Sequence, residues 1–235
     1  MKRKKILFGA TDIGWRIAVY KSFIERQFEN QLISESFSKY VVPSSFYKTK
    51  YTYTCSVDST PKPIFYLYCL WFFIKSIFRY DVFHFFSGET ILPRKLQGLE
   101  MRLYRIFKKE IIMHFVGADI RSPIYLEEKG KKIRSYLKGG SLVEPISLNF
   151  QLKIINLSKK YADYILVSTP DLLEIIPKAT YFPVLLDDYV QNQSVKTEAL
   201  SKVRKIKILH SPSGTKTKGS KYIYEALSNI LKKYP

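Results

Sequence analysis

The chain has 235 residues, of which 46% are hydrophobic and 25% charged, a balance that is typical of a folded protein and excludes wholesale disorder. Its 39 Lys and Arg against 20 Asp and Glu give a net charge of +19, which favours nucleic acid, acidic lipid head groups or phosphorylated small molecules as partners. Two cysteines, Cys55 and Cys69, exclude a disulfide framework and a four-cysteine zinc site.

Short apolar runs alternate with helical patterns along the chain. In chain order, the first half predicts a strand at Lys5–Ala10, a helix over Trp15–Phe28, a strand near Tyr51–Cys55, a helix over Ile64–Tyr80, a strand at Asp81–Phe86 and a helix over Pro93–Lys109. The second half predicts a strand at Glu110–Val116, a helix over Asn149–Tyr161, a strand at Tyr164–Ser168, a helix start at Ser168–Asp171, strands at Thr180–Leu186 and Lys205–His210, and a helix over Ser220–Lys233. Strands separated by helices predict an α/β protein with a Rossmann-like, doubly wound parallel sheet.

The pattern changes near residue 187 and divides the chain. Residues 1–186 are expected to form one Rossmann-like domain, and the polar residues 187–204 a linker. Residues 205–235 carry a strand and a helix, which we interpret as the first βα unit of a second Rossmann-like domain. The longest apolar run, Ile64–Ile74, is much shorter than the roughly 20 residues of a membrane span. The sequence therefore favours a cytoplasmic protein, with contact to the inner face of a membrane as an open alternative.

All three histidines lie in or at the end of a predicted strand. His84, His114 and His210 are placed there by the segments VFHFF, IIMHFVG and KILHSPS. Ligands of open α/β sheets bind beyond the carboxyl ends of the strands, which makes these histidines candidate site residues. The alternative is a core histidine that faces a helix, with one hydrogen bond satisfied. Their spacing matches no zinc motif, and no metal is assigned.

Two strand-to-helix loops have the composition of a phosphate cradle. Gly9 and Gly14 flank the first turn, where glycine allows close approach of a ligand or simply a tight turn. The loop SPSGTKTKG, with Ser213, Gly214, Lys218 and Gly219, offers hydroxyls, backbone amides and lysines at the start of a helix. Such a loop suits a diphosphate, and a solvated basic loop is an equal alternative.

Several segments together resemble the retaining GT-B glycosyltransferases, the group called glycosyl transferases group 1 or family 4. They are KILFGATDIG, YDVFHFFSG, HFVGADIR, YADYILVSTPDLLEIIP and KILHSPSGTKTKGSKYIYEAL, which follow one another in the family's order. The resemblance implies two Rossmann-like domains, an acceptor on the first and a nucleotide-sugar donor held by the second without a metal or other cofactor. It implies an enzyme that stabilises the leaving diphosphate with basic and backbone donors.

The resemblance also assigns roles to individual residues. Lys218 would contact the donor diphosphate, with Ser213, Gly214 and Gly219 shaping the loop. Gly9 and Gly14 would line the cleft from the first domain. Closer to the reacting groups, His114 is the candidate catalytic residue, and Asp119 and Arg121 lie on the acceptor side.

The expected function is transfer of a hexose from a nucleotide-sugar to a glycan or lipid-linked acceptor in surface polysaccharide synthesis. The family's second domain is longer than residues 205–235, so we expect a truncated product or a second chain that completes the donor site. The alternative is a non-catalytic, membrane-peripheral binding protein or one subunit of a split glycosyltransferase. Aromatic and basic residues in the helices 64–80 and 93–109 suit an anionic membrane, or else a core helix with a solvated basic edge. No signature of nucleic-acid binding is present, and we expect no nucleic-acid partner.

Overall fold

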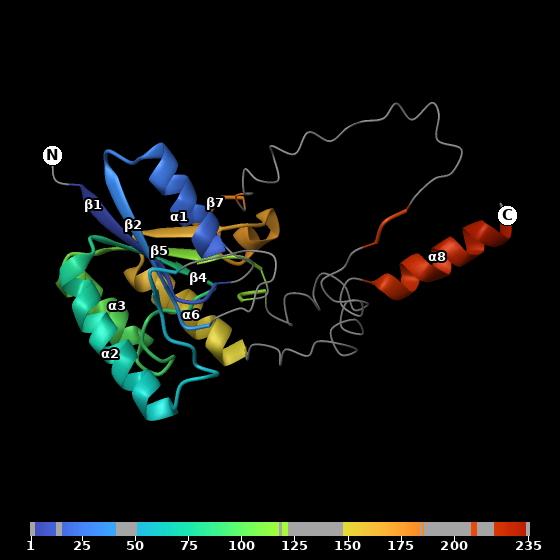
Figure 1. Ribbon diagram of the computed structural model, residues 1–235. Coiled ribbons are helices and arrows are strands. Elements are labelled where there is room, and N and C mark those ends of the chain that lie inside the picture. Colours follow the sequence, from blue (N-terminus) through green and yellow to red (C-terminus); the bar gives the residue numbers. More distant parts are fainter. Residues whose placement is uncertain are drawn as a thin grey trace. The chain divides into compact units, whose positions relative to one another are not determined.

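The computed structural model describes residues 3–12, 16–40, 51–117, 119–121, 148–183, 185, 208–210 and 219–233. The chain divides into two compact units, residues 1–121 with 149–191 and residues 122–148 with 192–235. Each unit is described by itself. In the first unit, the described residues form a parallel sheet with helices on both of its faces (Figure 1).

The sheet contains seven strands among the described residues, in the order β3-β2-β1-β4-β5-β6-β7. These strands are β1 (Lys4–Gly9), β2 (Leu32–Ser38), β3 (Tyr53–Thr54), β4 (Val82–Phe86), β5 (Glu110–Phe115), β6 (Tyr164–Val167) and β7 (Thr180–Tyr181). All six neighbouring pairs are parallel. The Rossmann-like, doubly wound α/β fold expected from the sequence is therefore confirmed.

The helices lie in two layers, one on each face of the sheet. α1 (Arg16–Gln27) covers one face, and α2 (Lys62–Arg79), α3 (Gln97–Ile106) and α6 (Leu148–Tyr161) cover the other (Figure 1). Side chains alternate across the strands: Phe83 and Phe85 of β4 pack in the larger core under α2 and α3, whereas Val82 and Phe86 pack in the smaller core under α1. Every residue of β4 is buried, which explains its continuous apolar sequence.

β2 is a strand whose position the sequence did not reveal. Its sequence LISESFS has serine at alternate positions, and Ser34, Ser36 and Ser38 are all buried. The backbone N–H of Ser36 donates to Thr52 Oγ1 over 3.1 Å, and the N–H of Thr52 donates to Ser36 Oγ over 3.0 Å. Because these hydroxyls are satisfied inside the protein, a polar sequence fills a buried strand.

Three other elements differ from their predicted form. The helix predicted to start at Ser168–Asp171 is a short 3-10 helix, Pro170–Glu174. Thr169, the residue before it, makes no capping hydrogen bond, and its hydroxyl accepts from Arg121. β7 is shorter than the strand predicted at Thr180–Leu186. Residues 208–210 carry no strand, and the remainder of the strand predicted at Lys205–His210 lies outside the described residues. The last helix, α8 (Ser220–Lys233), is where it was expected.

Within the described part of the chain, no helix has both the length and the apolar character needed to cross a membrane.

Candidate functional site

The strand order creates one topological switch point, at the carboxyl ends of β1 and β4. From β1 the chain runs to β2 on one side, whereas β4 lies on the other side and leads on to β5, β6 and β7. Helices therefore leave these two strands toward opposite faces, which opens the carboxyl edge between them. Gly9 pairs with Phe85 at this edge, so the residues that follow the two strands are neighbours in the sheet order.

Three buried polar atoms at this edge have no hydrogen-bond partner among the described residues. They are Thr11 Oγ1 after β1, Ser87 Oγ after β4 and Arg16 Nη1 at the start of α1. Buried polar atoms in folded proteins nearly always have a partner, and exceptions are expected where a ligand or water completes the bonds. Ser87 has a positive φ of 55° and its backbone N–H donates to His114 O over 2.8 Å, which holds it in place after β4.

Asp12 and Arg16 bring opposite charges to the same edge. Asp12 is buried; its Oδ1 accepts from the N–H of Ile17 over 3.2 Å, and its Oδ2 accepts from the hydroxyl of Tyr51 over 2.8 Å. Burial raises the pKa of Asp12 above the usual range, against these hydrogen bonds and the nearby Arg16. Burial likewise lowers the pKa of the Arg16 guanidinium, against the attraction of Tyr20, Asp119 and Asp12.

The candidate residues Asp119 and Arg121 shape the loop after β5. Asp119 is buried and accepts from the N–H groups of Val116, Gly117 and Ile120 over 2.9, 2.7 and 3.2 Å. Burial raises the pKa of Asp119, and these backbone donors oppose the rise. The loop is thereby closed around a carboxylate that lies within electrostatic reach of Arg16.

Arg121 ties this loop to the segment that follows β6. Its Nε donates to Asp171 Oδ2 over 2.8 Å, and its Nη2 donates to Thr169 Oγ1 over 3.2 Å. Burial acts to raise the pKa of Asp171, but its hydrogen bonds with Thr169 and Arg121 and the charge of Arg121 hold that pKa below its usual range. The described geometry gives Asp119 and Arg121 a shaping role at the carboxyl edge.

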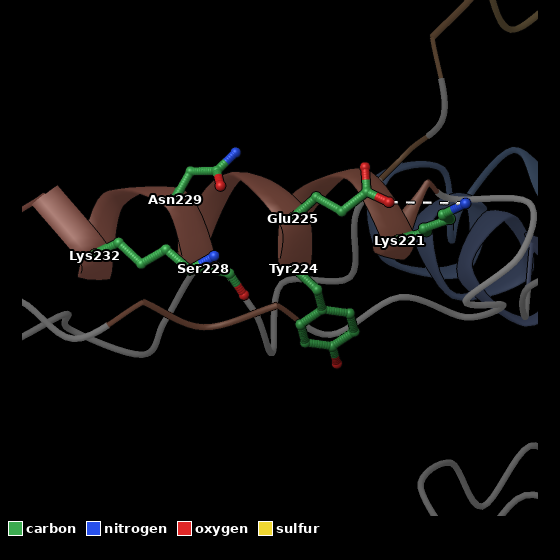
Figure 2. A pocket seen from close by; sticks show the side chains of 6 residues that line it. All are labelled: Lys221, Tyr224, Glu225, Ser228, Asn229 and Lys232. Atoms are coloured by element: carbon green, nitrogen blue, oxygen red, sulfur yellow. Dashed lines mark ion pairs between the residues drawn. The ribbon is translucent and has the colours of Figure 1, made fainter.

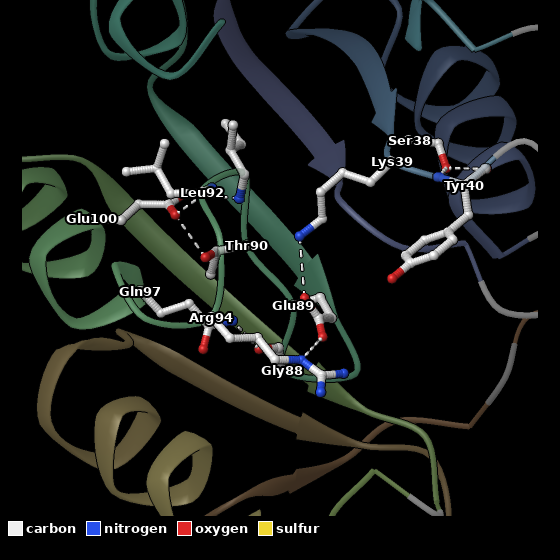
Figure 3. Close-up of polar contacts among 11 residues, drawn as sticks. Ser38, Lys39, Tyr40, Gly88, Glu89, Thr90, Leu92, Arg94, Gln97 and Glu100 are labelled. Atoms are coloured by element: carbon white, nitrogen blue, oxygen red, sulfur yellow. Dashed lines mark hydrogen bonds and ion pairs between the residues drawn. The ribbon is translucent and has the colours of Figure 1, made fainter. Parts of the chain in front are cut away.

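A second charged network braces the carboxyl ends of β2 and β4 (Figure 3). Lys39 Nζ lies 3.1 Å from Glu89 Oε2, and Arg94 Nε donates to Glu89 Oε1 over 2.7 Å. Lys39 and Glu89 are buried, and the N–H of Lys39 donates to Ala10 O over 2.8 Å. Because Glu89 accepts from two cations, its charge is compensated, and the network fixes the loops on either side of β1.

Beside this network, Glu100 of α3 anchors the same loop (Figure 3). This carboxylate is fully buried and accepts four hydrogen bonds of 2.7 to 2.9 Å. The donors are the hydroxyls of Thr90 and Tyr104 and the backbone N–H groups of Ile91 and Leu92. The loop after β4 is thus fixed at two successive positions, by the ion pairs of Glu89 and by the hydrogen bonds from residues 90–92 to Glu100.

His114 lies inside the core and not on the open edge. Its side chain is 0% exposed; Nδ1 lies 3.4 Å from His84 Nε2, and Nε2 lies 2.9 Å from Ser168 Oγ. Tyr20 of α1 packs edge-on against both imidazole rings. These surroundings match the core alternative left open by the sequence, and a catalytic role of His114 stays a prediction.

The low pKa of both histidines has a clear physical cause. Burial lowers the pKa of His114 to about 4, and the positive charge of Arg16 acts in the same direction. Burial lowers the pKa of His84 well below its usual range, and a charge on His114 would lower it further. Both rings are therefore neutral at physiological pH.

Gly9 lies at the end of β1 for a steric reason that the structure shows. A Cβ at this position would lie 3.2 Å from Phe37 O of the neighbouring strand β2. This close approach supports the tight-packing alternative for Gly9. Gly14, the other predicted cleft glycine, lies outside the described residues.

The predicted donor loop is described only at its flanks. Ser213, Gly214 and Lys218 lie outside the described residues. Gly219 has a φ of +71°, a conformation that favours glycine, and immediately precedes α8. His210 Nε2 lies 2.7 Å from Oγ of Ser220, the first residue of that helix. The diphosphate site at Lys218 therefore stays a prediction.

A surface hollow of about 700 Å³ lies along α8 (Figure 2). Its lining side chains all come from this one helix, at positions that share a face: Lys221, Tyr224, Glu225, Ser228, Asn229 and Lys232. Lys221 and Glu225 form an ion pair along the helix over 3.7 Å. A hollow with one described wall lacks the converging polar groups of a ligand site.

No group of three or more His, Cys, Asp or Glu side chains that would hold a metal ion occurs in the described part of the chain. That the protein works without a metal ion stays a prediction from the sequence.

Comparison with known proteins finds likenesses among solved structures. No model of a protein family matches the chain, and no curated protein matches it. A similar solved structure is the complex of a UDP-glucosyltransferase from Polygonum tinctorium, capable of glucosylating indoxyl, and 3,4-dichloroaniline. The identity is 11% and the TM-score 0.42, over 91% of this chain and 56% of that chain. The chain thus spans little more than half the length of that protein.

Proposed function

We propose that this chain is the acceptor-side part of a GT-B glycosyltransferase that transfers a hexose from a nucleotide-sugar to a glycan or lipid-linked acceptor in surface polysaccharide synthesis. The observation that carries the proposal is the group of unpartnered polar atoms on Thr11, Arg16 and Ser87 at the switch point. This is the edge where open α/β sheets bind ligands.

The charges at this edge favour a neutral polyhydroxyl ligand over an anion. Arg16 lies within electrostatic reach of two buried carboxylates, Asp12 and Asp119, so its charge is already compensated. The unpartnered atoms combine a guanidinium donor with two hydroxyls that donate or accept. Sugar hydroxyl groups need this mixture of donors and acceptors, which supports an acceptor glycan at this edge.

The sequence segments that resemble the family support the same location. GATDIG, HFFSG, HFVGADIR and ILVSTPD lead into the loops that follow β1, β4, β5 and β6. We further propose that Lys218, with Ser213, Gly214 and Gly219, binds the donor diphosphate without a metal. A diphosphate that carries its charge on leaving gains most from such fixed donors.

The proposal is tested by transfer from labelled UDP-, GDP- and ADP-hexoses to glycan and polyprenyl-linked acceptors, with the full chain. Arg16→Met is expected to lower transfer about tenfold or more, because a charge-assisted hydrogen bond to the acceptor is lost. Lys218→Ala is expected to weaken nucleotide-sugar affinity in calorimetry. The matched control is Lys4→Ala, which removes an exposed cation from the first residue of β1, at the opposite edge of the sheet.

The result that contradicts an acceptor site at this edge is equal transfer by the wild type and a folded Arg16→Met variant. A chain that neither binds nor turns over any nucleotide-sugar, even together with a second chain that completes the donor domain, contradicts the glycosyltransferase proposal as a whole. Circular dichroism and urea titration of each variant separate a loss of function from a loss of folding.

A further inference from the structure

α2 is apolar on two sides, only one of which faces the core. Phe65, Cys69, Phe72, Phe73 and Ile77 are buried against the sheet. The opposite side carries large apolar residues spaced three or four apart, which places them on one face of the helix. They are Ile64, Leu67, Leu70, Trp71, Ile74 and Phe78, with exposed fractions from 46% for Leu70 to 76% for Phe78.

This exposed face continues onto α3 and its end. The rings of Phe78 and Phe107 are in edge-to-face contact, with 5.8 Å between centroids, although both side chains are exposed. Ile106, the last residue of α3, is 61% exposed. We define the α2–α3 apolar surface as Ile64, Leu67, Leu70, Trp71, Ile74, Phe78, Ile106 and Phe107. Large contiguous apolar patches on a folded protein mark a site of interaction.

Apart from the buried Glu100, the charged side chains of α2 and α3 are all basic. The Lys75 ammonium lies 4.8 Å from the ring centre of Trp71. Arg102 of α3 and Lys108 of the turn that follows α3 are exposed. α2 contains no acidic residue, and Glu100, the acidic residue of α3, is completely buried. The basic edge is therefore not neutralised from within these two helices.

We propose that the α2–α3 apolar surface binds to an anionic membrane surface, with α2 lying in the plane of the interface. Apolar and aromatic residues on one helix face, flanked by Lys and Arg, are the pattern of interfacial helices that enter the boundary between headgroups and acyl chains. α2 does not meet the requirements of a membrane span, and its other face is occupied by the core. α2 therefore rests on one leaflet and does not cross it.

Charge decides between a membrane and a second copy of the chain. A symmetric dimer through this surface would bring two sets of Lys75, Arg102 and Lys108 together, and like charges at an interface are unfavourable. Anionic lipid head groups complement the same cations, and each Lys or Arg near such a surface adds to the attraction. The proposal does not depend on the glycosyltransferase activity.

The first experiment uses Trp71 as a probe of the interface. The chain has two tryptophans, so Trp15→Phe leaves Trp71, 51% exposed, as the single reporter. The anionic vesicles contain phosphatidylcholine with about 30 mol% of the anionic lipid phosphatidylglycerol. They are expected to shift the emission of Trp71 to shorter wavelength. Lipids brominated in the acyl chain are expected to quench it. Pure phosphatidylcholine vesicles are expected to do neither.

The second experiment measures co-sedimentation with the same vesicles in the otherwise native chain, and so does not depend on the folding of the tryptophan variant. Lys75→Gln with Arg102→Gln is expected to lower partition onto anionic vesicles about 25-fold, since two interfacial cations are removed. Lys178→Gln, at an exposed position before β7, is the charge control. Leu67→Ser with Ile74→Ser is expected to abolish sedimentation. Tyr164→Ser is the apolar control, because Tyr164 pairs with Ile112 on the sheet face that α1 covers.

Three outcomes would overturn the proposal. Equal binding to neutral and anionic vesicles would remove the electrostatic argument. An unchanged Trp71 emission, while the protein sediments with anionic vesicles, would assign binding to another surface. A concentration-dependent dimer in light scattering that Leu67→Ser with Ile74→Ser converts to a monomer, without vesicle binding by the wild type, would assign the surface to a second copy of the chain.

Discussion

The buried pair His84 and His114 makes the first unit sensitive to acid. The pKa of His114 is about 4 in the folded protein, against about 6.5 in an unfolded chain. Between pH 6.5 and pH 4 the unfolded chain therefore binds a proton at this position and the folded chain does not, so the free energy of unfolding decreases as the pH falls. One pH unit corresponds to about 1.4 kcal/mol per histidine.

The size of the effect follows from this interval. From pH 7.5 to pH 5, His114 alone is expected to remove about 2 kcal/mol of stability, and about 3 kcal/mol by pH 4. His84 acts in the same direction, because its pKa is lowered by the same burial. The raised pKa values of the buried carboxyls Asp12 and Asp119 act in the opposite direction, so the wild-type curve alone does not isolate the histidines.

The assay compares urea unfolding of the wild type and His114→Asn at pH 7.5 and pH 5. The variant is expected to be less stable at pH 7.5, because its buried partners His84 and Ser168 lose a hydrogen bond, and to lose about 2 kcal/mol less than the wild type on going to pH 5. Leu152→Ser, an exposed substitution without a titratable group, is the control and is expected to follow the wild type. Parallel loss of stability by the wild type and His114→Asn would refute the argument that the pair stays neutral.

Three further substitutions test the packing around the candidate site, each by urea unfolding. Gly88→Ala is expected to lower the free energy of unfolding by about 2–4 kcal/mol. Gly88 has a φ of +72°, and a Cβ there would lie 2.4 Å from Ile154 Cδ1. A loss below about 1 kcal/mol would contradict this geometry. Glu100→Gln is expected to cost about 3 kcal/mol or more, because the NH2 group that replaces one carboxylate oxygen cannot accept from the two buried donors that face it. The exposed Glu110→Gln serves as its control. Lys4→Ala is expected to change stability by less than about 1 kcal/mol, since its ion pair with Glu110 is exposed; a larger change would show that this surface pair is coupled to the core.

The sequence predicted the strands that are apolar. It did not predict the strand whose serine hydroxyl groups form hydrogen bonds inside the folded protein. β4 was visible because all five of its residues are buried and four of them are large and apolar. β2 was not placed, because its buried Ser34 and Ser36 find their partners, Lys21 and Thr52, 13 and 16 positions away in the chain. Local composition reports burial reliably for apolar residues, but the cost of burying a serine depends on contacts far along the chain.

The candidate site shows a similar division. The turn between Gly9 and Gly14 and the segment HFFSG were recognised separately, but Thr11, Arg16 and Ser87 were not singled out. These three residues lie at the same edge of the sheet because β1 and β4 are neighbouring strands. The order of the elements along the chain does not show which strands are neighbours. The apolar run of α2 predicted a helix, yet its exposed side was not evident because both sides of the helix are apolar.

The central place of β1 in the sheet has a consequence for synthesis of the protein. The first strand emerges first from the ribosome, yet one of its two neighbours is β4, and the hydrogen bond between Lys5 and Asp81 joins residues 76 positions apart. At roughly 5–20 residues per second, Leu7 and Phe8 wait roughly 4–15 s before that neighbour exists. During this interval the nascent chain also presents the aromatic sequence of α2. We therefore expect this part of translation to be a stage at which chaperones assist the chain.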